Sequence, residues 1–265
     1  MTLTRRSFLA SASIGGLGSW IYLPPQGGPA PSTTVPLSFP SHDPAVAREM
    51  VAVSHGNVAR VRELLSTRPD LAKASWDWGF GDWETALGAA SHVGNREIAE
   101  LLIAAGAPVT LFSAAMLGQL ATVKAFIAAS PGVQRVKGPH GIPLLAHAQL
   151  GKAVEVVAYL ESLGDADPRY RDDAVSDEDR AAILGAYSYG SGATERLTVS
   201  VHARGHLVIQ RAGAPERTLF HQGGRVFHPS GAEAVRIRFS AGAKSMELRV
   251  EDGPLVVVAS RVSSL

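Results

Sequence analysis

The chain has 265 residues, and its 25 basic and 24 acidic residues give a formal net charge of +1, which does not favour a nucleic-acid binder. The absence of cysteine excludes disulfides, thiolate metal ligands and cysteine nucleophiles. A hydrophobic content of 46% is sufficient for one or two modest domains with apolar cores.

The amino-terminal residues predict an export signal. A weakly apolar stretch rich in Gly, Ala and Ser runs to Leu23 and is too short and glycine-rich to favour a membrane span. The motif before it resembles the bacterial twin-arginine signal and is carried by Arg5, Arg6, Phe8 and Leu9. The resemblance implies a periplasmic or otherwise exported bacterial protein, with residues 1–30 as the signal peptide. Contact with the membrane is expected only through an uncleaved signal, and the cleavage site stays open.

Residues 31–44 predict an extended linker. Prolines recur throughout residues 24–44, and they are incompatible with a helix interior or a central strand. Such a segment would act as a spacer before the first domain.

Residues 81–106 predict a helix–turn–helix unit. Small residues from Ala86 to Ala90 favour a first helix, and Gly94 breaks it at a place suited to positive φ. A second helix then carries an apolar face and ends at Gly106. Weaker copies of this pattern are centred on Gly56, Gly118 and Gly151.

This unit resembles an ankyrin repeat, with Thr85-Ala86-Leu87-Gly88 where the family has Thr-Pro-Leu-His. The resemblance implies an α-solenoid of about four repeats over residues 45–168, and such stacks usually bind other macromolecules. A single repeat cannot bury its apolar face, so several must stack. The central glycines are unevenly spaced, and an unrelated helical bundle is the alternative.

An aromatic segment before this unit is the candidate partner-binding surface. Exposed aromatic side chains on a projecting finger are typical of interface hot spots. The alternative is a small satellite core, in which Trp83 would be the most buried tryptophan. The residues assigned to partner binding are Trp76, Asp77, Trp78, Phe80 and Asp82 on the finger, and Ser91, His92 and Met116 on the inner helices.

Residues 169–185 form an acidic connector to a basic carboxy-terminal part. A solvated linker is the favoured interpretation, and binding back onto the basic domain is the alternative. From residue 186 to 265, apolar residues alternate with polar ones in short runs separated by Gly-containing breaks. This pattern predicts an antiparallel β-barrel or meander, so the fold class is multidomain α + β.

The segment Leu184-Gly185-Ala186-Tyr187-Ser188-Tyr189-Gly190 and the strands after it resemble the small β-barrel accessory domain of penicillin-recognising serine hydrolases. In that family the barrel carries no catalytic residues of its own. A Ser-x-x-Lys nucleophile, a Gly-x-Ser-x-Gly elbow and a phosphate-binding loop are all missing from the sequence.

Of the nine histidines, His202, His206, His221 and His228 are interpreted as surface residues, since a metal site would also need carboxylates nearby. His140 and His147 fall where polar caps are ordinary. We therefore expect no metal, no cofactor and no catalytic residue.

The sequence favours a monomeric, exported, non-catalytic scaffold or regulatory protein that binds another protein. One alternative is a hydrolase with a site between the helical part and the β domain, which would need convergent titratable groups. Another is a small-ligand binder in which the barrel interior surrounds an unfilled cavity.

Overall fold

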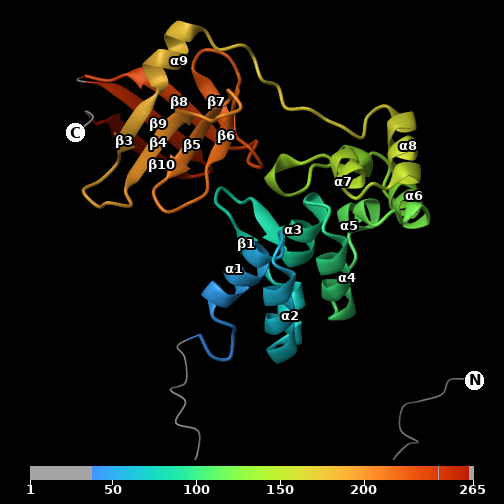
Figure 1. The fold of residues 1–265 in the computed structure, drawn as a ribbon. Helices are drawn as coiled ribbons and strands as arrows, with labels where there is room; N and C mark the ends of the chain where they lie inside the picture. Colours follow the sequence, from blue (N-terminus) through green and yellow to red (C-terminus); the bar gives the residue numbers. More distant parts are fainter. Residues whose placement is uncertain (1–37, 244, 263–265) are drawn as a thin grey trace, which may run out of the picture.

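The computed structural model describes residues 38–243 and 245–262, so the predicted export signal and most of the linker lie outside the described residues. A helical part comes first and a β-barrel second (Figure 1). The helices are α1 (Pro44–Val53), α2 (Val58–Thr67), α3 (Ala86–His92), α4 (Arg96–Ala104), α5 (Leu111–Met116), α6 (Leu120–Ala129), α7 (Leu144–Leu150), α8 (Val154–Leu163) and α9 (Asp177–Ile183).

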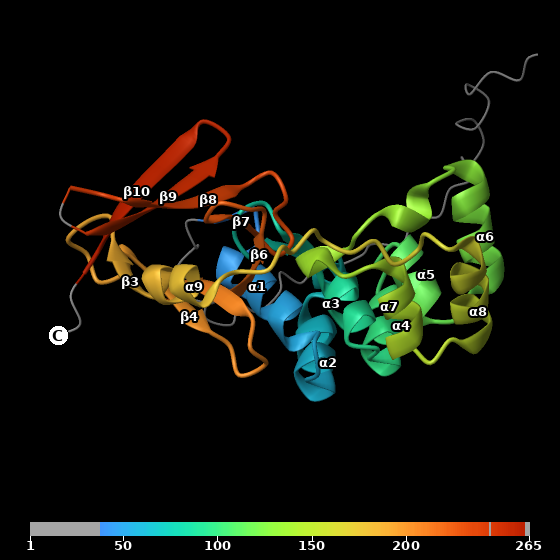
Figure 2. The same cartoon turned by 90° about the horizontal axis from the view of Figure 1, so that it is seen from above.

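The first eight helices form four antiparallel pairs that lie side by side (Figure 2). The first helices of successive pairs contact one another in the order α1, α3, α5 and α7. Asn57 and Asn95 cap the second helices of the first two pairs, since their side-chain oxygens accept hydrogen bonds from the amides of Arg60 and Ile98. The facing sides bury small and aliphatic residues in two clusters, one over the first two pairs and one over the last two.

The turn at Gly94 confirms the predicted positive φ, which is +72°. A Cβ at this position would come within 2.4 Å of the carbonyl oxygen of Leu150, at the end of α7. Glycine is therefore required here both by its own backbone conformation and by the close approach of another helix pair.

The ankyrin interpretation is wrong, because the helix pairs do not form a regular repeat. The first helices have 10, 7, 6 and 7 residues. The segments between pairs also differ: within the described residues a β-hairpin follows the first pair, a short loop the second and two 3-10 turns the third. What is present is an irregular set of helix pairs within a mixed α + β fold.

The aromatic segment forms that hairpin, from β1 (Ser75–Asp77) and β2 (Trp83–Thr85). The strands pair antiparallel, with Trp76 opposite Glu84. Trp76 and Trp78 pack against the helical core, whereas Phe80 packs against the barrel core. The hairpin therefore bridges the two parts of the molecule.

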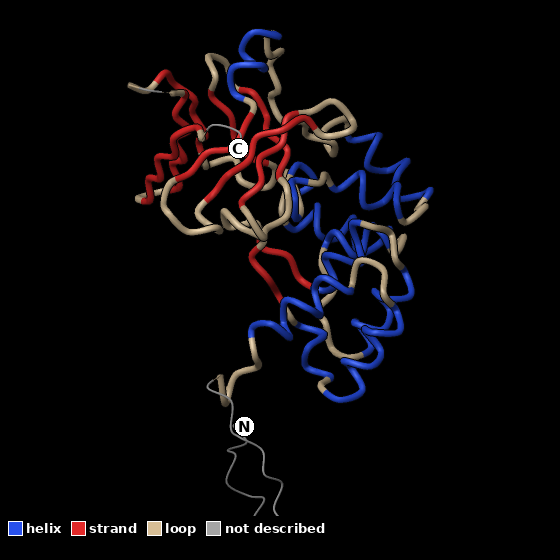
Figure 3. Tube along the Cα trace, turned by 60° about the vertical axis from the view of Figure 1, so that its left-hand side comes forward, coloured by secondary structure: helices blue, strands red, loops and turns tan. Residues whose placement is uncertain are grey.

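The carboxy-terminal part is a closed antiparallel barrel, which confirms the predicted barrel (Figure 3). Each strand pairs with its neighbour in sequence, and β10 closes the barrel against β3. The predicted alternation is present, for example in β4, where Leu197 and Val199 are buried between exposed neighbours. The strands are β3 (Gly185–Ser188), β4 (Arg196–Val201), β5 (Leu207–Arg211), β6 (Arg217–His221), β7 (Val226–Pro229), β8 (Arg236–Ala241), β9 (Met246–Asp252) and β10 (Leu255–Arg261).

The acidic connector binds back onto the barrel, which corrects the favoured expectation of a solvated linker. The segment between α8 and α9 runs from the helical part to the barrel (Figure 1). Asp179 of α9 forms an ion pair with Arg225 at 2.5 Å, and Asp172 accepts a hydrogen bond from the amide of His221. Ile183 is fully buried in the barrel core, so opposite charge and apolar burial both hold the connector. No helix among the described residues combines the length and apolar character needed to span a membrane.

A buried histidine in α7 predicts acid sensitivity. Burial lowers the pKa of His147 to about 4, against an unfolded value of about 6.5. The folded state is uncharged at this residue between these values, whereas the unfolded state binds a proton. The resulting stabilisation is present in full above pH 6.5 and is lost as the pH falls towards 4, by up to about 3 kcal/mol. Urea unfolding of His147→Leu across this range should show a shallower pH dependence than the parent, and equal slopes would contradict the assignment.

Candidate metal centre

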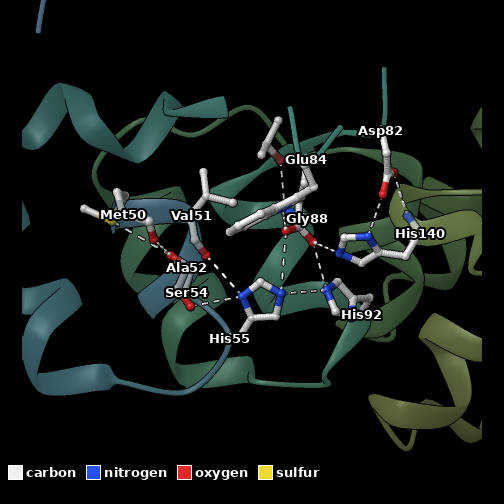
Figure 4. A network of polar contacts seen from close by, with 12 residues as sticks. Met50, Val51, Ala52, Ser54, His55, Asp82, Glu84, Gly88, His92 and His140 are labelled. Carbon is white, nitrogen blue, oxygen red and sulfur yellow. Dashed lines mark hydrogen bonds and ion pairs between the residues drawn. The ribbon is translucent and has the colours of Figure 1, made fainter. Parts of the chain in front are cut away.

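Four side chains from separate elements converge at the boundary between the helices and the barrel (Figure 4). They are His55, Glu84, His92 and His140, and one potential ligand atom from each lies within 4.8 Å of all the others. We call these four residues the histidine–glutamate cluster. It is the one group of this kind among the described residues.

Local structure places each member. His55 follows the carboxy-terminal end of α1, and His92 is the last residue of α3 in the next pair. Because α1 and α3 are stacked, their ends lie together, and the two Nε2 atoms are 3.1 Å apart. Glu84 is the middle residue of β2, with its side chain directed inward.

His140 reaches the cluster from the loop before α7. It lies in a short 3-10 turn, Pro139–Gly141, and has a positive φ of +60°. Its amide donates a hydrogen bond to Oδ1 of Asp82 at 2.8 Å, and its ring Nδ1 donates to Oδ2 at 2.7 Å. Two bonds to one buried carboxylate hold this unfavourable backbone conformation and aim Nε2 at Glu84.

The spacing of the ligand atoms matches that of a metal site. Oε1 of Glu84 lies 2.8 Å from Nε2 of His92 and 3.4 Å from Nε2 of His140. Oε2 lies 3.5 Å from Nε2 of His55. Ligands of a tetrahedral zinc ion at about 2.0–2.1 Å are separated from one another by about 3.3 Å.

The outer nitrogens of two rings are already occupied. Nδ1 of His55 lies 3.0 Å from the carbonyl oxygen of Ala52 and 3.2 Å from that of Val51, so it carries the hydrogen. Nδ1 of His140 donates to Asp82. In the neutral form of each ring, Nε2 then faces the cluster with a lone pair, the arrangement found around metal-bound histidines. The pKa of His140 is raised to about 9, so a metal ion would have to displace the proton on its Nε2.

The buried carboxylate of Glu84 turns one oxygen towards the imidazoles of the cluster. Its side chain is fully buried, and Oε2 accepts a hydrogen bond from the indole of Trp78 at 2.7 Å. Oε1 makes no well-aligned hydrogen bond within the described residues, and the nitrogens nearest to it are Nε2 of His92 at 2.8 Å and Nε2 of His140 at 3.4 Å. A buried ionised carboxylate must be compensated by donors or by a cation, and a metal ion among the ligand atoms would supply that positive charge.

The electrostatics of the cluster also favour a cation. Burial opposes the ionisation of Glu84, but its contacts with His140 and His92 outweigh this effect and lower its pKa to about 2. Burial likewise opposes the charged form of His140, but Asp82 and Glu84 outweigh it and raise the pKa of that ring to about 9. Two ionised carboxylates thus stabilise positive charge at this point.

A cavity of about 310 Å³ borders the cluster. Its lining includes His55 and His140 but neither Glu84 nor His92. The barrel contributes Arg217, Thr218 and Ser230 to the lining. An ion or a small molecule would therefore reach the cluster from this cavity.

Asp82 joins the centre to the barrel. Its carboxylate forms a buried ion pair with Arg217 of β6 and accepts the two hydrogen bonds from His140. Burial opposes its ionisation, but these partners outweigh it and lower its pKa. Lys137 and Glu233 form a second ion pair across the same boundary at 2.7 Å.

The residues predicted to bind a partner are divided by the structure. His92 belongs to the cluster, and Asp82 and Trp78 are bonded to its members. Ser91 and Met116 are fully buried, so their assignment to a binding surface is corrected. The remaining predicted residues, Trp76, Asp77 and Phe80, line a larger cavity beside the hairpin.

The most buried tryptophan was also wrongly predicted. Trp83 is 64% exposed, because it alternates with inward-facing Glu84 on β2. Trp76 and Trp78 are the half-buried ones. This outcome agrees with the satellite-core alternative for those two rings.

No known family model matches this chain. A comparison with curated proteins likewise found no match. Neither result supports the ankyrin resemblance. The resemblance to the accessory domain of the serine hydrolases is supported only to the extent that the carboxy-terminal part is a closed barrel.

The cluster was not predicted from the sequence, although one signal for it is present. His55 precedes Gly56-Asn57, and His92 precedes Val93-Gly94-Asn95. These are nearly equivalent positions of two helix pairs, and equivalent positions of stacked pairs lie close together. Glu84 and His140 could not be added in this way, because they come from a hairpin and a loop outside the helices.

Proposed function

We propose that this protein binds a divalent transition-metal ion in the histidine–glutamate cluster. The observation that carries the proposal is the convergence of three imidazoles on the fully buried carboxylate of Glu84. Imidazole nitrogens with a single carboxylate suit first-row ions such as Zn²⁺, whereas Mg²⁺ and Ca²⁺ prefer oxygen ligands.

The neighbouring cavity favours metal-assisted hydrolysis as the activity. A bound dication would polarise a carbonyl or phosphoryl oxygen and lower the pKa of a bound water. Trp78 and the carbonyl of Ala52 orient the ligands, and Arg217 contributes a guanidinium to the lining of the cavity. This function corresponds to the hydrolase alternative. That alternative needs convergent titratable groups, and the histidine–glutamate cluster provides such groups.

The test is metal binding by the full chain. After removal of metal with a chelator, titration with Zn²⁺ should show one tight site, and Co²⁺ should give visible absorption of a four-coordinate centre. The double variant His202→Ala and His206→Ala is the control, because those two rings also stack on each other, near Glu216. Loss of the tight site in this control, or no binding by the parent, would overturn the proposal.

The activity is tested with p-nitrophenyl acetate and p-nitrophenyl phosphate. Metal-loaded protein should hydrolyse one of them faster than metal-free protein does. If metal-loaded and metal-free protein hydrolyse each probe at the same rate, that result would count against a hydrolase of ester or phosphoester substrates.

Export and the binding of another protein stay predictions. Arg5 and Arg6 lie outside the described residues, and replacing both with lysine should retain the protein in the cytoplasm if they direct export. An export route that passes folded proteins is compatible with a metal loaded before transport.

A further inference from the structure

A second and larger cavity lies between the β1–β2 hairpin and the mouth of the barrel. Its volume is about 580 Å³, which is within the range of small-molecule sites. It shares Trp78, Pro215 and Arg217 with the lining of the cavity beside the metal centre, so the two are adjacent.

The walls of this cavity are mostly apolar and come from both parts of the molecule. The barrel supplies inward-facing residues of its core, Leu197, Ile209 and Val250. The hairpin supplies the rings of Trp76, Trp78 and Phe80. The cavity therefore lies where the aromatic side chains of the hairpin meet residues of the barrel core.

The polar side chains at the cavity carry an excess of positive charge. Arg48, Arg211 and Arg217 line it, against Asp77 and Asp252. One oxygen of Asp77 already accepts a hydrogen bond from the amide of Gly79 at 2.8 Å. This leaves the arginines as the distinctive polar feature of the lining.

Two of these arginines are available to an anion. Neither Arg48 nor Arg211 belongs to an ion pair between described residues; the ion pairs with arginine involve other side chains. Nε of Arg211 donates to the hydroxyl of Tyr189 at 3.1 Å, which holds the guanidinium at the rim. The guanidinium of Arg48 lies 6.0 Å from the centre of the Trp78 ring.

The third arginine has an unused donor. Arg217 is buried and pairs with Asp82 through Nη1, but its buried Nη2 has no hydrogen-bond partner within the described residues. A buried guanidinium nitrogen favours an oxygen acceptor, and a ligand carboxylate in the cavity would provide one.

We propose that this cavity binds a small carboxylic acid with an aromatic body. The body lies against the tryptophan and barrel side chains, and the carboxylate is bound by the arginines, above all Arg211. This site is distinct from the proposed metal centre and does not require a bound ion. The proposal therefore goes beyond the proposed function.

Three matched probes test it by calorimetry: 4-phenylbutyrate, its amide and 4-phenylbutylamine. Their bodies are the same, and their charges are negative, zero and positive. The full chain should bind the carboxylate at least about tenfold more tightly than the amide, because charge-assisted hydrogen bonds to arginine add to the same apolar burial. The affinities should be unchanged when a chelator is present, which separates this test from that of the metal centre.

Two variants locate the site. Arg211→Gln removes an exposed guanidinium and should weaken the binding of the carboxylate about tenfold while leaving the binding of the amide unchanged. Arg249→Gln is the matched control, since Arg249 lies on the barrel surface next to Glu251, and it should change neither affinity. Val257→Phe should weaken the binding of both the carboxylate and the amide, because the larger side chain reduces the volume of the cavity. Absence of binding, equal affinity for the three probes, or no effect of Arg211→Gln would overturn the proposal.

Discussion

Replacing Glu84 with glutamine should weaken metal binding by at least about 100-fold while leaving the fold intact. Loss of a residue that only orients a ligand typically costs 10–100-fold in metal affinity, so loss of the ligand charge itself should cost no less. The amide is nearly isosteric with the carboxylate, and its oxygen can still accept the hydrogen bond from Trp78. The measurement is a competitive Zn²⁺ titration against a chromophoric chelator, with thermal unfolding of the metal-free protein as the check on folding.

Glu100→Gln is the matched control for this substitution. Glu100 is exposed and its contact with Arg96 is 3.6 Å long, so the same chemical change there should leave the Zn²⁺ affinity within about twofold of the parent. His92→Ala offers an independent test, because it removes a nitrogen ligand rather than the carboxylate. Unchanged affinity in both Glu84→Gln and His92→Ala would exclude the histidine–glutamate cluster as the metal site.

Replacing Asp82 with alanine should lower the free energy of unfolding by about 3–5 kcal/mol. The change would leave Arg217 buried without its carboxylate and would remove both hydrogen bonds that hold His140. It should also weaken Zn²⁺ binding by about 10–100-fold, since Asp82 orients a ligand rather than touching the ion. Urea unfolding of the metal-free protein and the Zn²⁺ titration measure the two effects separately.

Asp70→Ala is the control for the Asp82 experiment. Asp70 is exposed and pairs with His42 on the surface, so its removal should change stability by no more than about 0.5 kcal/mol. The double variant Asp82→Ala and Arg217→Met should be more stable than Asp82→Ala alone, because it no longer buries an unpaired charge. A loss below about 1 kcal/mol in Asp82→Ala would contradict the role assigned to this ion pair.

Local pattern predicted the secondary structure of much of the chain. The alternating residues of the carboxy-terminal part, such as Leu197 and Val199, indicated strands with one buried face, and both side chains are buried in the barrel. Gly94 indicated a turn of positive φ between two helices, which is also confirmed. These features depend on near neighbours in the chain, so periodicity and backbone preference are enough to predict them.

The histidine–glutamate cluster was beyond this kind of inference. His55 and Glu84 are 29 positions apart, and His140 follows Glu84 by a further 56, with no metal-binding motif between them. Trp83 was misplaced for a related reason: one step along a strand exchanges the inward and outward faces, and the sequence alone did not show which face of the hairpin meets the helices.

By itself, the sequence determined helix pairs with glycine turns, an antiparallel sheet of alternating strands and a cysteine-free chain with balanced charge. Three features depend on tertiary contacts: the choice of a closed barrel over an open meander, the return of the acidic connector to the barrel through Asp179 and Ile183, and the link that Asp82 makes between Arg217 and His140. The physical reason is that side-chain periodicity reports burial, whereas the identity of the burying partner depends on contacts between distant segments. In the sequence, His55, His92 and His140 cannot be distinguished from ordinary polar residues. Only the stacking of α1 on α3, and of the hairpin on both helices, brings their side chains to the carboxylate of Glu84.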